Sequence, residues 1–344
     1  MPRPAAGPAR HARITGLGRA LPSRVVTNDD LAQLVDTSDE WIQSRTGIAQ
    51  RRFAGEGEST ATLGAAAASE ALEQSGVDPS AVDLLICASC TPDHLLFPSN
   101  ACLIQQALGL KRAGAFDLSA ACSGFVYGLI TASQLIQAGV HRTVLVVGAD
   151  TLSRFLDFTD RTTCVLFGDG ASAAVIEASD EPGGLLSFIL GADGSGADSV
   201  IVPVGGSRHP LGEAEPDRHA RSIQMNGREV YRFSTTVPAT ALQQATCNAG
   251  VTTQDLDLIL AHQANVRILQ TLARNLQLPE ERFYVNVDRY GNTCGASVPL
   301  ALYDAHAEGL IHPGSLLGFL GFGAGLTWAV AIWRWQGLAG ARQP

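Results

Sequence analysis

Apolar runs of strand length alternate with segments that have helical spacing along most of the chain. The runs Leu84–Ala88, 142–147 and 257–260 are short, almost wholly apolar and rich in Leu, Ile and Val, which is typical of buried strands. Between them, residues 58–76 and 99–108 carry alanine and leucine at helical spacing. Continuous apolar strands separated by helices predict an α/β protein with a mostly parallel sheet covered on both faces.

The chain also resembles itself at long range. Residues 76–86 resemble residues 250–260, and residues 167–171 resemble residues 322–326, with offsets of 174 (250 − 76) and 155 (322 − 167) residues. Two similar α/β halves are therefore predicted, meeting near residue 180 in a segment of loop composition. The expected organisation is a flexible N-terminal extension, a half with the candidate nucleophile and a half with its partners, over residues 1–12, 13–180 and 181–344.

Composition and charge exclude several classes of protein. The 344 residues carry a net charge of −9, which disfavours nucleic acid and anionic membranes as partners unless a local basic patch binds them. No uninterrupted apolar run has the ~18 residues of a membrane span, and the start of the chain lacks the apolar core of a signal peptide. Seven cysteines without the spacing of a disulfide framework indicate a reducing compartment. We therefore expect a soluble, cytoplasmic protein.

Candidate chemistry lies in three short polar segments that follow apolar runs or begin helix-like ones. They are residues 120–124, 261–265 and 290–293. Cys122 precedes a helix-like segment, and the N-terminus of a helix favours the thiolate form of a cysteine. His262 follows the apolar run at 257–260, and Asn292 precedes a helix rich in small residues. Taken singly, each has an ordinary structural alternative: a small core residue, a hydrogen-bonded core histidine and a helix cap.

Taken together, the three residues indicate covalent acyl transfer. A neutral histidine and an asparagine can both donate hydrogen bonds to one carbonyl oxygen, which stabilises the enolate formed when a β-carboxylate leaves as carbon dioxide. The glycine-rich segment 321–325 offers free amides for an oxyanion hole beside the amide of Cys122, or simply a turn before the last strand.

Two further motifs carry less chemistry. Gly16-Leu-Gly18 lacks the third glycine of a dinucleotide fingerprint. Cys87-Ala-Ser-Cys90 is a single CxxC without a second pair for zinc, and core packing is its expected role. The sequence therefore predicts neither a metal site nor a bound cofactor.

Several ordered motifs resemble the β-ketoacyl-(acyl carrier protein) synthase III family of the thiolase-like superfamily. They are residues 37–42 with 45–48, the Cys122 segment, 159–161 with 167–170, 262–265, 290–293 and 321–325. The resemblance extends from about Ala12 to Trp335. It implies two duplicated halves with mixed, mainly parallel sheets in a layered α-β-α-β-α arrangement. It also implies a homodimer that uses acyl-CoA as a substrate and malonyl-acyl carrier protein as the second substrate.

The resemblance implies a role for each matching residue. Cys122 accepts the acyl group, His262 and Asn292 support decarboxylation, and the amides of Cys122 and Ala324 form the oxyanion hole. Coenzyme A binding is implied for Trp41, Arg45, Arg161 and Asn265, with Trp41 and Arg161 stacking on the adenine. The acyl pocket is implied for Leu152, Phe322 and Phe97, the last reaching across the dimer interface. Docking of the acidic carrier protein is implied for Arg232, Arg267 and Arg274.

The implied reaction starts fatty-acid synthesis by decarboxylative condensation of an acyl-CoA starter with malonyl-acyl carrier protein. An alternative within the same scaffold is a ketosynthase of a specialised polyketide or antibiotic pathway that takes longer or carrier-bound acyl chains. A thiolase or a hydroxymethylglutaryl-CoA synthase needs a second catalytic cysteine or a glutamate, and the context of Cys294 does not match the former. A non-catalytic acyl-binding protein would not need the cysteine, histidine and asparagine together. The excursion at 203–219 and Arg228 depart from the family pattern and leave the acyl chain length, the pathway and the carrier protein open.

Overall fold

The computed structural model describes residues 11–212 and 217–338. The expected N-terminal extension, apart from its last two residues, lies outside the described residues, as does part of the 203–219 excursion. The first strand, β1 (His11–Ala20), already begins at His11. Residues 11 and 12 therefore belong to a sheet, and the boundary expected after residue 12 is wrong by two residues.

Two mixed sheets form the framework of the chain. The first has the order β1-β7-β6-β4-β5. Its other strands are β7 (Asp169–Ser179), β6 (Thr143–Thr151), β4 (Leu84–Ala88) and β5 (Gly114–Leu118). The second has the order β11-β12-β13-β8. Its strands are β11 (Leu258–Ala261), β12 (Leu316–Gly323), β13 (Thr327–Arg334) and β8 (Gly184–Ala192).

The sheets are less parallel than the sequence pattern predicts. Strand β4 is parallel to β5 and β6, and β11 is parallel to β12. The pairs β1–β7, β6–β7, β12–β13 and β13–β8 are antiparallel. Strands β12 and β13 are joined by a short turn rather than by a crossover helix, which returns the chain antiparallel. Of these antiparallel strands, β6, β7, β12 and β13 are buried on both faces over most of their length, and they have the continuous apolar sequence that is typical of parallel strands.

Nine α-helices complete the described part of the chain. They are α1 (Asn28–Ala32), α2 (Asp39–Thr46), α3 (Thr60–Ser75), α4 (Asn100–Ala107), α5 (Gly124–Gln137), α6 (Gly227–Asn248), α7 (Val266–Leu276), α8 (Val287–Tyr290) and α9 (Ser297–Ala307). Two small two-stranded sheets pair β2 (Arg24–Thr27) with β3 (Gln50–Phe53) and β9 (Val200–Ile201) with β10 (Gln224–Met225). Among the described helices, none is long and apolar enough to span a bilayer.

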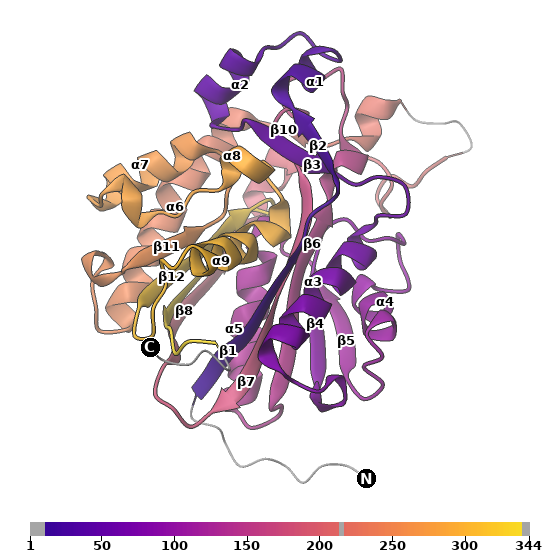
Figure 1. Ribbon diagram of the computed structural model, residues 1–344. Helices are drawn as coiled ribbons and strands as arrows, with labels where there is room; N and C mark the ends of the chain where they lie inside the picture. The colour runs from indigo at the N-terminus through magenta and orange to yellow at the C-terminus, as the bar shows by residue number, and fades with distance from the viewer. Residues whose placement is uncertain (1–10, 213–216, 339–344) are drawn as a thin grey trace.

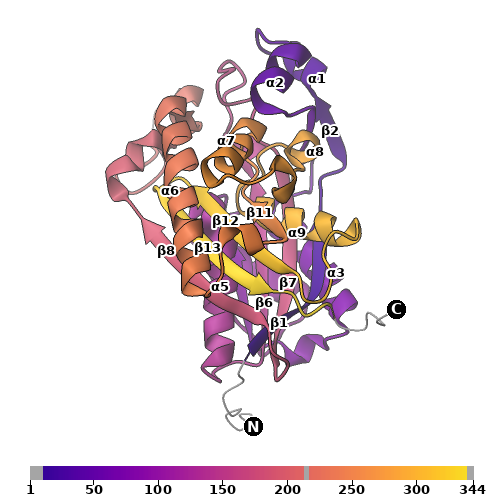
Figure 2. The same ribbon diagram turned by 90° about the vertical axis from the view of Figure 1, so that its left-hand side faces the viewer.

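The elements stack in five layers, as the resemblance implies (Figure 1). Helices α3 and α4 cover the outer face of the first sheet, and α6 and α7 cover that of the second. Helices α5 and α9 lie between the sheets and contact both (Figure 1), and Figure 2 views the molecule from the side of α6 and α7. The largest apolar cluster is centred on this middle layer, with Phe125, Phe319 and Trp333 fully buried. The expected strand at Leu84–Ala88 and helices near 58–76 and 99–108 are all present as β4, α3 and α4.

Gly16 and Gly18 serve close packing rather than a nucleotide. A Cβ on Gly16 would lie 2.2 Å from the carbonyl oxygen of Ala71, and one on Gly18 would lie 2.1 Å from that of Ala67. Both carbonyls belong to α3, so the two glycines allow β1 to pack directly against this helix.

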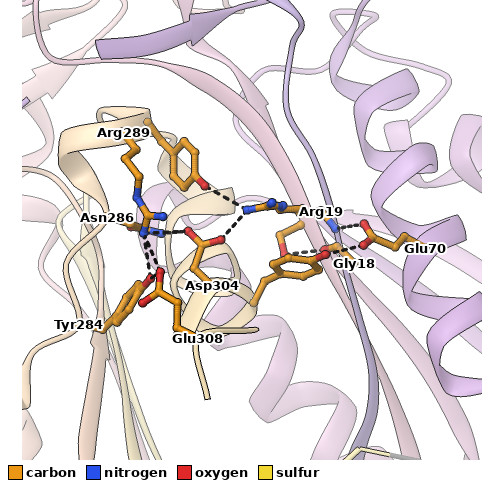
Figure 3. Close-up of polar contacts among 11 residues, drawn as sticks. Gly18, Arg19, Glu70, Tyr284, Asn286, Arg289, Asp304 and Glu308 are labelled. Carbon is orange, nitrogen blue, oxygen red and sulfur yellow. Dashed lines mark hydrogen bonds and ion pairs between the residues drawn. The ribbon is translucent and has the colours of Figure 1, made fainter. Parts of the chain in front are cut away.

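A buried carboxylate ties the second half of the chain to β1 (Figure 3). Asp304 on α9 is 3% exposed and pairs with Arg19 of β1 at 2.6 Å and with Arg289 of α8 at 3.4 Å. The Nδ2 of Asn286 donates to the same carboxylate at 3.0 Å. The backbone N–H of Arg19 in turn donates to Glu70 of α3 at 2.8 Å. These contacts fix the segment that precedes Asn292 against the first sheet.

Candidate active site

The three predicted residues converge on one cavity. Its volume is about 450 Å³, and its lining is largely apolar. Cys122, His262 and Asn292 all line it, although they lie on segments up to 170 residues apart (292 − 122). The cavity therefore brings a thiol, an imidazole and a carboxamide together.

Cys122 lies in a tight turn directly before α5. The 3-10 turn Ala121–Ser123 precedes the helix, and Ala121 adopts the left-handed conformation with φ of 46°. This conformation is costly for a residue with a Cβ, and such residues cluster at functional sites. The end of β12 lies close against the turn, because a Cβ on Gly323 would be only 2.9 Å from the Cys122 nitrogen and 3.1 Å from its Sγ.

Two backbone amides beside this sulfur are free to donate. Among the described residues, neither the N–H of Cys122 nor that of Ala324 has a hydrogen-bond partner. Ala324 follows Gly323 in the turn between β12 and β13 and lines the same cavity. Unpaired N–H groups at a nucleophile are the donors that an oxyanion hole requires.

His262 is buried and held in a fixed orientation. It follows β11 directly, its N–H donates to Leu320 O at 2.8 Å, and the ring of Phe322 packs edge-on against it at 5.3 Å between centroids. The Nδ1 atom lies 3.1 Å from Ser297 Oγ, which also accepts the N–H of Gln263 at 2.6 Å. Burial lowers the pKa of His262 to about 3, so its imidazole is neutral at physiological pH.

The side chain of Asn292 is oriented by the residues around it. Its N–H donates to Leu166 O at 2.8 Å, and its carbonyl oxygen accepts the N–H of Gly168 at 2.9 Å. Its Oδ1 accepts the N–H of Cys294 at 2.9 Å. Since the side-chain oxygen is engaged, the amide Nδ2 is left to donate toward the cavity. Asn292 therefore acts as a fixed donor.

Comparison with known proteins identifies the family. The family model for 3-oxoacyl-[acyl-carrier-protein (ACP)] synthase III matches residues 116–194, and the model for its C-terminal part matches residues 247–335. A β-ketoacyl-[acyl-carrier-protein] synthase III from Roseiflexus sp. (strain RS-1) is 49% identical over 95% of this chain and 99% of its own. This chain belongs to the synthase III family.

Solved structures agree with this assignment. The synthase III of Thermus thermophilus has a TM-score of 0.88 at 46% identity and covers 94% of this chain and 99% of its own. The priming β-ketosynthase of the R1128 polyketide pathway has a TM-score of 0.89 at 36% identity, with 97% and 99% coverage. The solved structures similar to this chain thus include a protein named synthase III and a priming ketosynthase of a polyketide pathway.

In this synthase III, the residues expected to bind coenzyme A gather at the cavity mouth. Trp41, Arg45 and Asn265 line the cavity. The Asn265 Nδ2 donates to Arg45 O at 3.0 Å, joining the start of α7 to the end of α2. Arg161 does not line the cavity, but its guanidinium lies 5.2 Å from the centre of the Trp41 ring. An adenine between these two side chains requires them to separate.

The residues expected to line the acyl pocket are dispersed in the single chain. Phe322 is buried and lines the cavity. Leu152 is also buried, in the apolar cluster against which Cys122 packs, and does not line this cavity. Phe97 lies on the surface, 81% exposed, beside the exposed Leu95 and Leu96.

The three arginines expected to receive the carrier protein are exposed on α6 and α7. Arg267 lines the candidate active-site cavity, whereas Arg232 lines a second cavity of about 380 Å³. Phe233 lines both cavities, so the two cavities are adjacent. Arg274 lines neither and donates to Thr271 Oγ1 at 2.9 Å.

Several residues that orient the site are not evident from the sequence. Ser297 is hydrogen-bonded to the imidazole of His262, and the backbone of Asn292 is hydrogen-bonded to that of Leu166 and Gly168. Cys294 places its sulfur 3.6 Å from that of Cys122. The only sign of this proximity in the sequence is that Cys294 follows Asn292 by two residues.

Proposed function

We propose that this synthase III condenses an acyl-CoA starter with malonyl-acyl carrier protein and so initiates fatty-acid synthesis. The observation that carries the proposal is the convergence of one thiol and two neutral donors, Cys122, His262 and Asn292, on a single cavity. This set suits an acyltransferase that works through an acyl-cysteine. It lacks the carboxylate that orients the histidine of a hydrolytic triad, because His262 Nδ1 faces the hydroxyl of Ser297.

In the first half-reaction, the sulfur of Cys122 attacks the thioester carbon of the acyl-CoA. The carbonyl oxygen becomes an oxyanion, and the N–H groups of Cys122 and Ala324 donate to it. The intermediate collapses, the thiolate of coenzyme A leaves, and the acyl group stays on Cys122 as a thioester. Trp41, Arg45, Arg161 and Asn265 hold the nucleotide end of the donor at the cavity mouth.

In the second half-reaction, the malonyl thioester loses carbon dioxide and becomes an enolate. His262 and Asn292 stabilise the charge on its oxygen. The hydroxyl of Ser297 satisfies both neighbours when it accepts from Gln263 and donates to His262 Nδ1, which leaves the imidazole proton on Nε2. The enolate carbon then attacks the acyl group, and the Cys122 thiolate is released. Because burial holds the pKa of His262 at about 3, the imidazole stays neutral and donates a hydrogen bond from Nε2 to the enolate oxygen.

A basic surface lies on the helices α6 and α7. Arg232, Arg267 and Arg274 form the surface that receives the acidic carrier protein, next to the opening of the cavity. The seven cysteines are all free thiols, which supports a reducing compartment such as the cytoplasm. No bound cofactor has a role in this scheme, since acyl-CoA is consumed as a substrate.

The priming ketosynthase of a polyketide pathway is the second candidate function. It is favoured by one observation, the 36% identity to the R1128 enzyme across nearly the whole of both chains. The two functions share every catalytic step and differ in the acyl group that Cys122 accepts. Donor choice therefore separates them.

Intact-protein mass spectrometry after incubation with acyl-CoA and acyl-carrier donors of increasing length tests the proposal. We expect wild type to gain the acyl mass of short acyl-CoA donors, and Cys102→Ser, which alters an exposed thiol, to behave identically. Retention of long or carrier-bound acyl groups only would favour the second function. No acyl mass on wild type, or an acyl mass on Cys122→Ala, would overturn the covalent mechanism.

We propose further that two copies of the chain form a dimer in which Phe97 of each bounds the acyl pocket of the other. The exposed apolar run Leu95–Phe97 and the half-exposed Phe116 on the edge strand β5 support an interface on this side of the first sheet.

Phe97→Ala is expected to shift donor choice toward longer chains. Removal of the ring opens space for methylenes, each contributing up to about 0.8 kcal/mol when buried. The same donor panel measures the shift, with sedimentation to confirm that the variant remains dimeric. A dimeric variant with an unchanged preference would contradict the role of Phe97.

A further inference from the structure

Three thiols lie in a row that leads away from the candidate nucleophile. The Sγ of Cys122 is 3.6 Å from that of Cys294, which is 3.4 Å from that of Cys90. They come from three separate segments: the turn before α5, the 3-10 turn Cys294–Ala296 and the loop after β4. Cys122 lines the cavity, Cys294 is 3% exposed and Cys90 is an exposed residue. The proposed condensation uses only the first of the three.

A carboxylate anchors the far end of this row. Cys90 Sγ donates to Asp150 Oδ1 at 3.4 Å. Each S–H hydrogen is used once if Cys122 donates to Cys294, Cys294 donates to Cys90 and Cys90 donates to Asp150. The thiols are thus hydrogen-bonded neighbours rather than three separate core residues.

The ligand atoms of Cys90, Asp150 and Cys294 all lie within 4.8 Å of one another, so a metal ion is the first alternative. The carboxylate is already engaged: Oδ1 accepts the N–H groups of Cys90 and Thr91, and Oδ2 accepts that of Gly295. Redox chemistry of the thiols fits the site better.

We propose that the three cysteines form a redox relay. In this relay Cys294 forms a disulfide with oxidised Cys122, and Cys90 then replaces Cys122 in that disulfide by thiol–disulfide exchange. The oxidant is a hydroperoxide that enters through the substrate cavity. The relay protects the nucleophile from irreversible oxidation and returns it to its thiol form.

The steps balance without any other reactant. The Cys122 thiolate attacks hydrogen peroxide, the O–O bond breaks, and the products are Cys122 sulfenic acid and hydroxide, which takes a proton to become water. The sulfur of Cys294 then attacks the sulfenic sulfur. An S–S bond forms, the S–O bond breaks, and the hydroxyl leaves as water with the Cys294 thiol proton. Two thiols are oxidised by two electrons, and one peroxide is reduced to two waters.

The second step is thiol–disulfide exchange within the row. Cys90 attacks the sulfur of Cys294, the Cys122–Cys294 bond breaks, and Cys122 leaves as a thiolate while the Cys90 proton returns to it. The disulfide then joins Cys90 and Cys294. Side-chain rotation has to bring the sulfurs of Cys122 and Cys294 from 3.6 Å, and those of Cys90 and Cys294 from 3.4 Å, to the ~2.0 Å of an S–S bond.

This inference rests on the proposed role of Cys122 as the nucleophile, and the two fail differently. Acylation of the untreated protein tests the proposed function, whereas disulfide formation is read from the mass and the cysteine-containing peptides without any substrate. A protein that acylates but forms no disulfide retains the function and loses the relay.

The experiment treats the full-length protein with hydrogen peroxide, stops the reaction with catalase and maps disulfides by mass spectrometry under non-reducing conditions. We expect wild type to lose two hydrogens, to show first a Cys122–Cys294 peptide and then a Cys90–Cys294 peptide, and to recover acylation without added thiol. Cys90→Ser should stop at the Cys122–Cys294 disulfide and recover only with dithiothreitol. Cys294→Ser should gain two or three oxygens on Cys122 and not recover. The matched control Cys102→Ser should behave as wild type.

Each contrary result is decisive. Absence of the Cys122–Cys294 peptide in wild type, or equal recovery of wild type and Cys294→Ser, overturns Cys294 as the capturing thiol. Recovery of Cys90→Ser without a reductant overturns the exchange step. Stoichiometric metal in the purified protein, lost in Cys90→Ser and Cys294→Ser, assigns the cluster to a metal instead.

Discussion

His262→Ala is expected to leave acylation of Cys122 intact while the condensation rate falls by about 10²- to 10³-fold, the usual cost of removing one donor to a developing oxyanion. The structure gives the physical reason. His262 is neutral, its Nδ1 side is occupied by Ser297, and its other nitrogen is left to donate toward the enolate. Acylation needs the amides of Cys122 and Ala324 and no such donor.

The measurement separates the two half-reactions of the His262→Ala variant. Intact mass after acetyl-CoA reports acylation, and product formation from the pre-acylated enzyme and malonyl-acyl carrier protein reports condensation. His312→Ala, which alters an exposed histidine, is the matched control. If acylation falls as far as condensation, His262 acts as the base for Cys122, and the division of labour is wrong.

The sequence predicts the members of the site better than their mutual positions. Cys122, His262 and Asn292 stand at strand ends and helix starts, where α/β folds concentrate chemistry, so local pattern and residue type suffice to find them. Their supports are long-range: Leu166 meets Asn292 and Ser297 meets His262 only because separate strands and helices pack together. The row of thiols that ends at Cys90 joins segments 204 residues apart, and no spacing in the chain indicates it.

In the fold, too, local elements are predictable from the sequence and long-range arrangement is not. The strand at Leu84–Ala88 and the helices α3 and α4 follow from periodicity alone. Strand direction does not, because burial on both faces gives β7 and β13 the same apolar sequence whichever way they run. Phe97 is exposed in the single chain, and only the proposed dimer would give its ring a place in an acyl pocket.

Gly323→Ala is expected to slow acylation itself, by about 10²-fold, because a displacement of about 1 Å at a reacting atom has a cost of that order. The added Cβ would lie 2.8 Å from the Cβ of Cys122 and 2.9 Å from its nitrogen, closer than such atoms approach. Cys122 has to move, and both its sulfur and its N–H then lose alignment with Ala324. The effect is the converse of that of His262→Ala, since the first half-reaction is impaired.

The rate of acetyl transfer to the enzyme, followed by rapid-quench mass spectrometry, measures the effect of Gly323→Ala. Gly206→Ala is the matched control, since a Cβ there meets no atom within 4 Å. A thermal melt of both variants distinguishes misalignment of the nucleophile from unfolding. A folded Gly323→Ala variant that acylates at the rate of wild type would show that the close approach of β12 to Cys122 does not position the nucleophile. Because the glycine also precedes Ala324, that result would remove the end of β12 from the oxyanion hole as well.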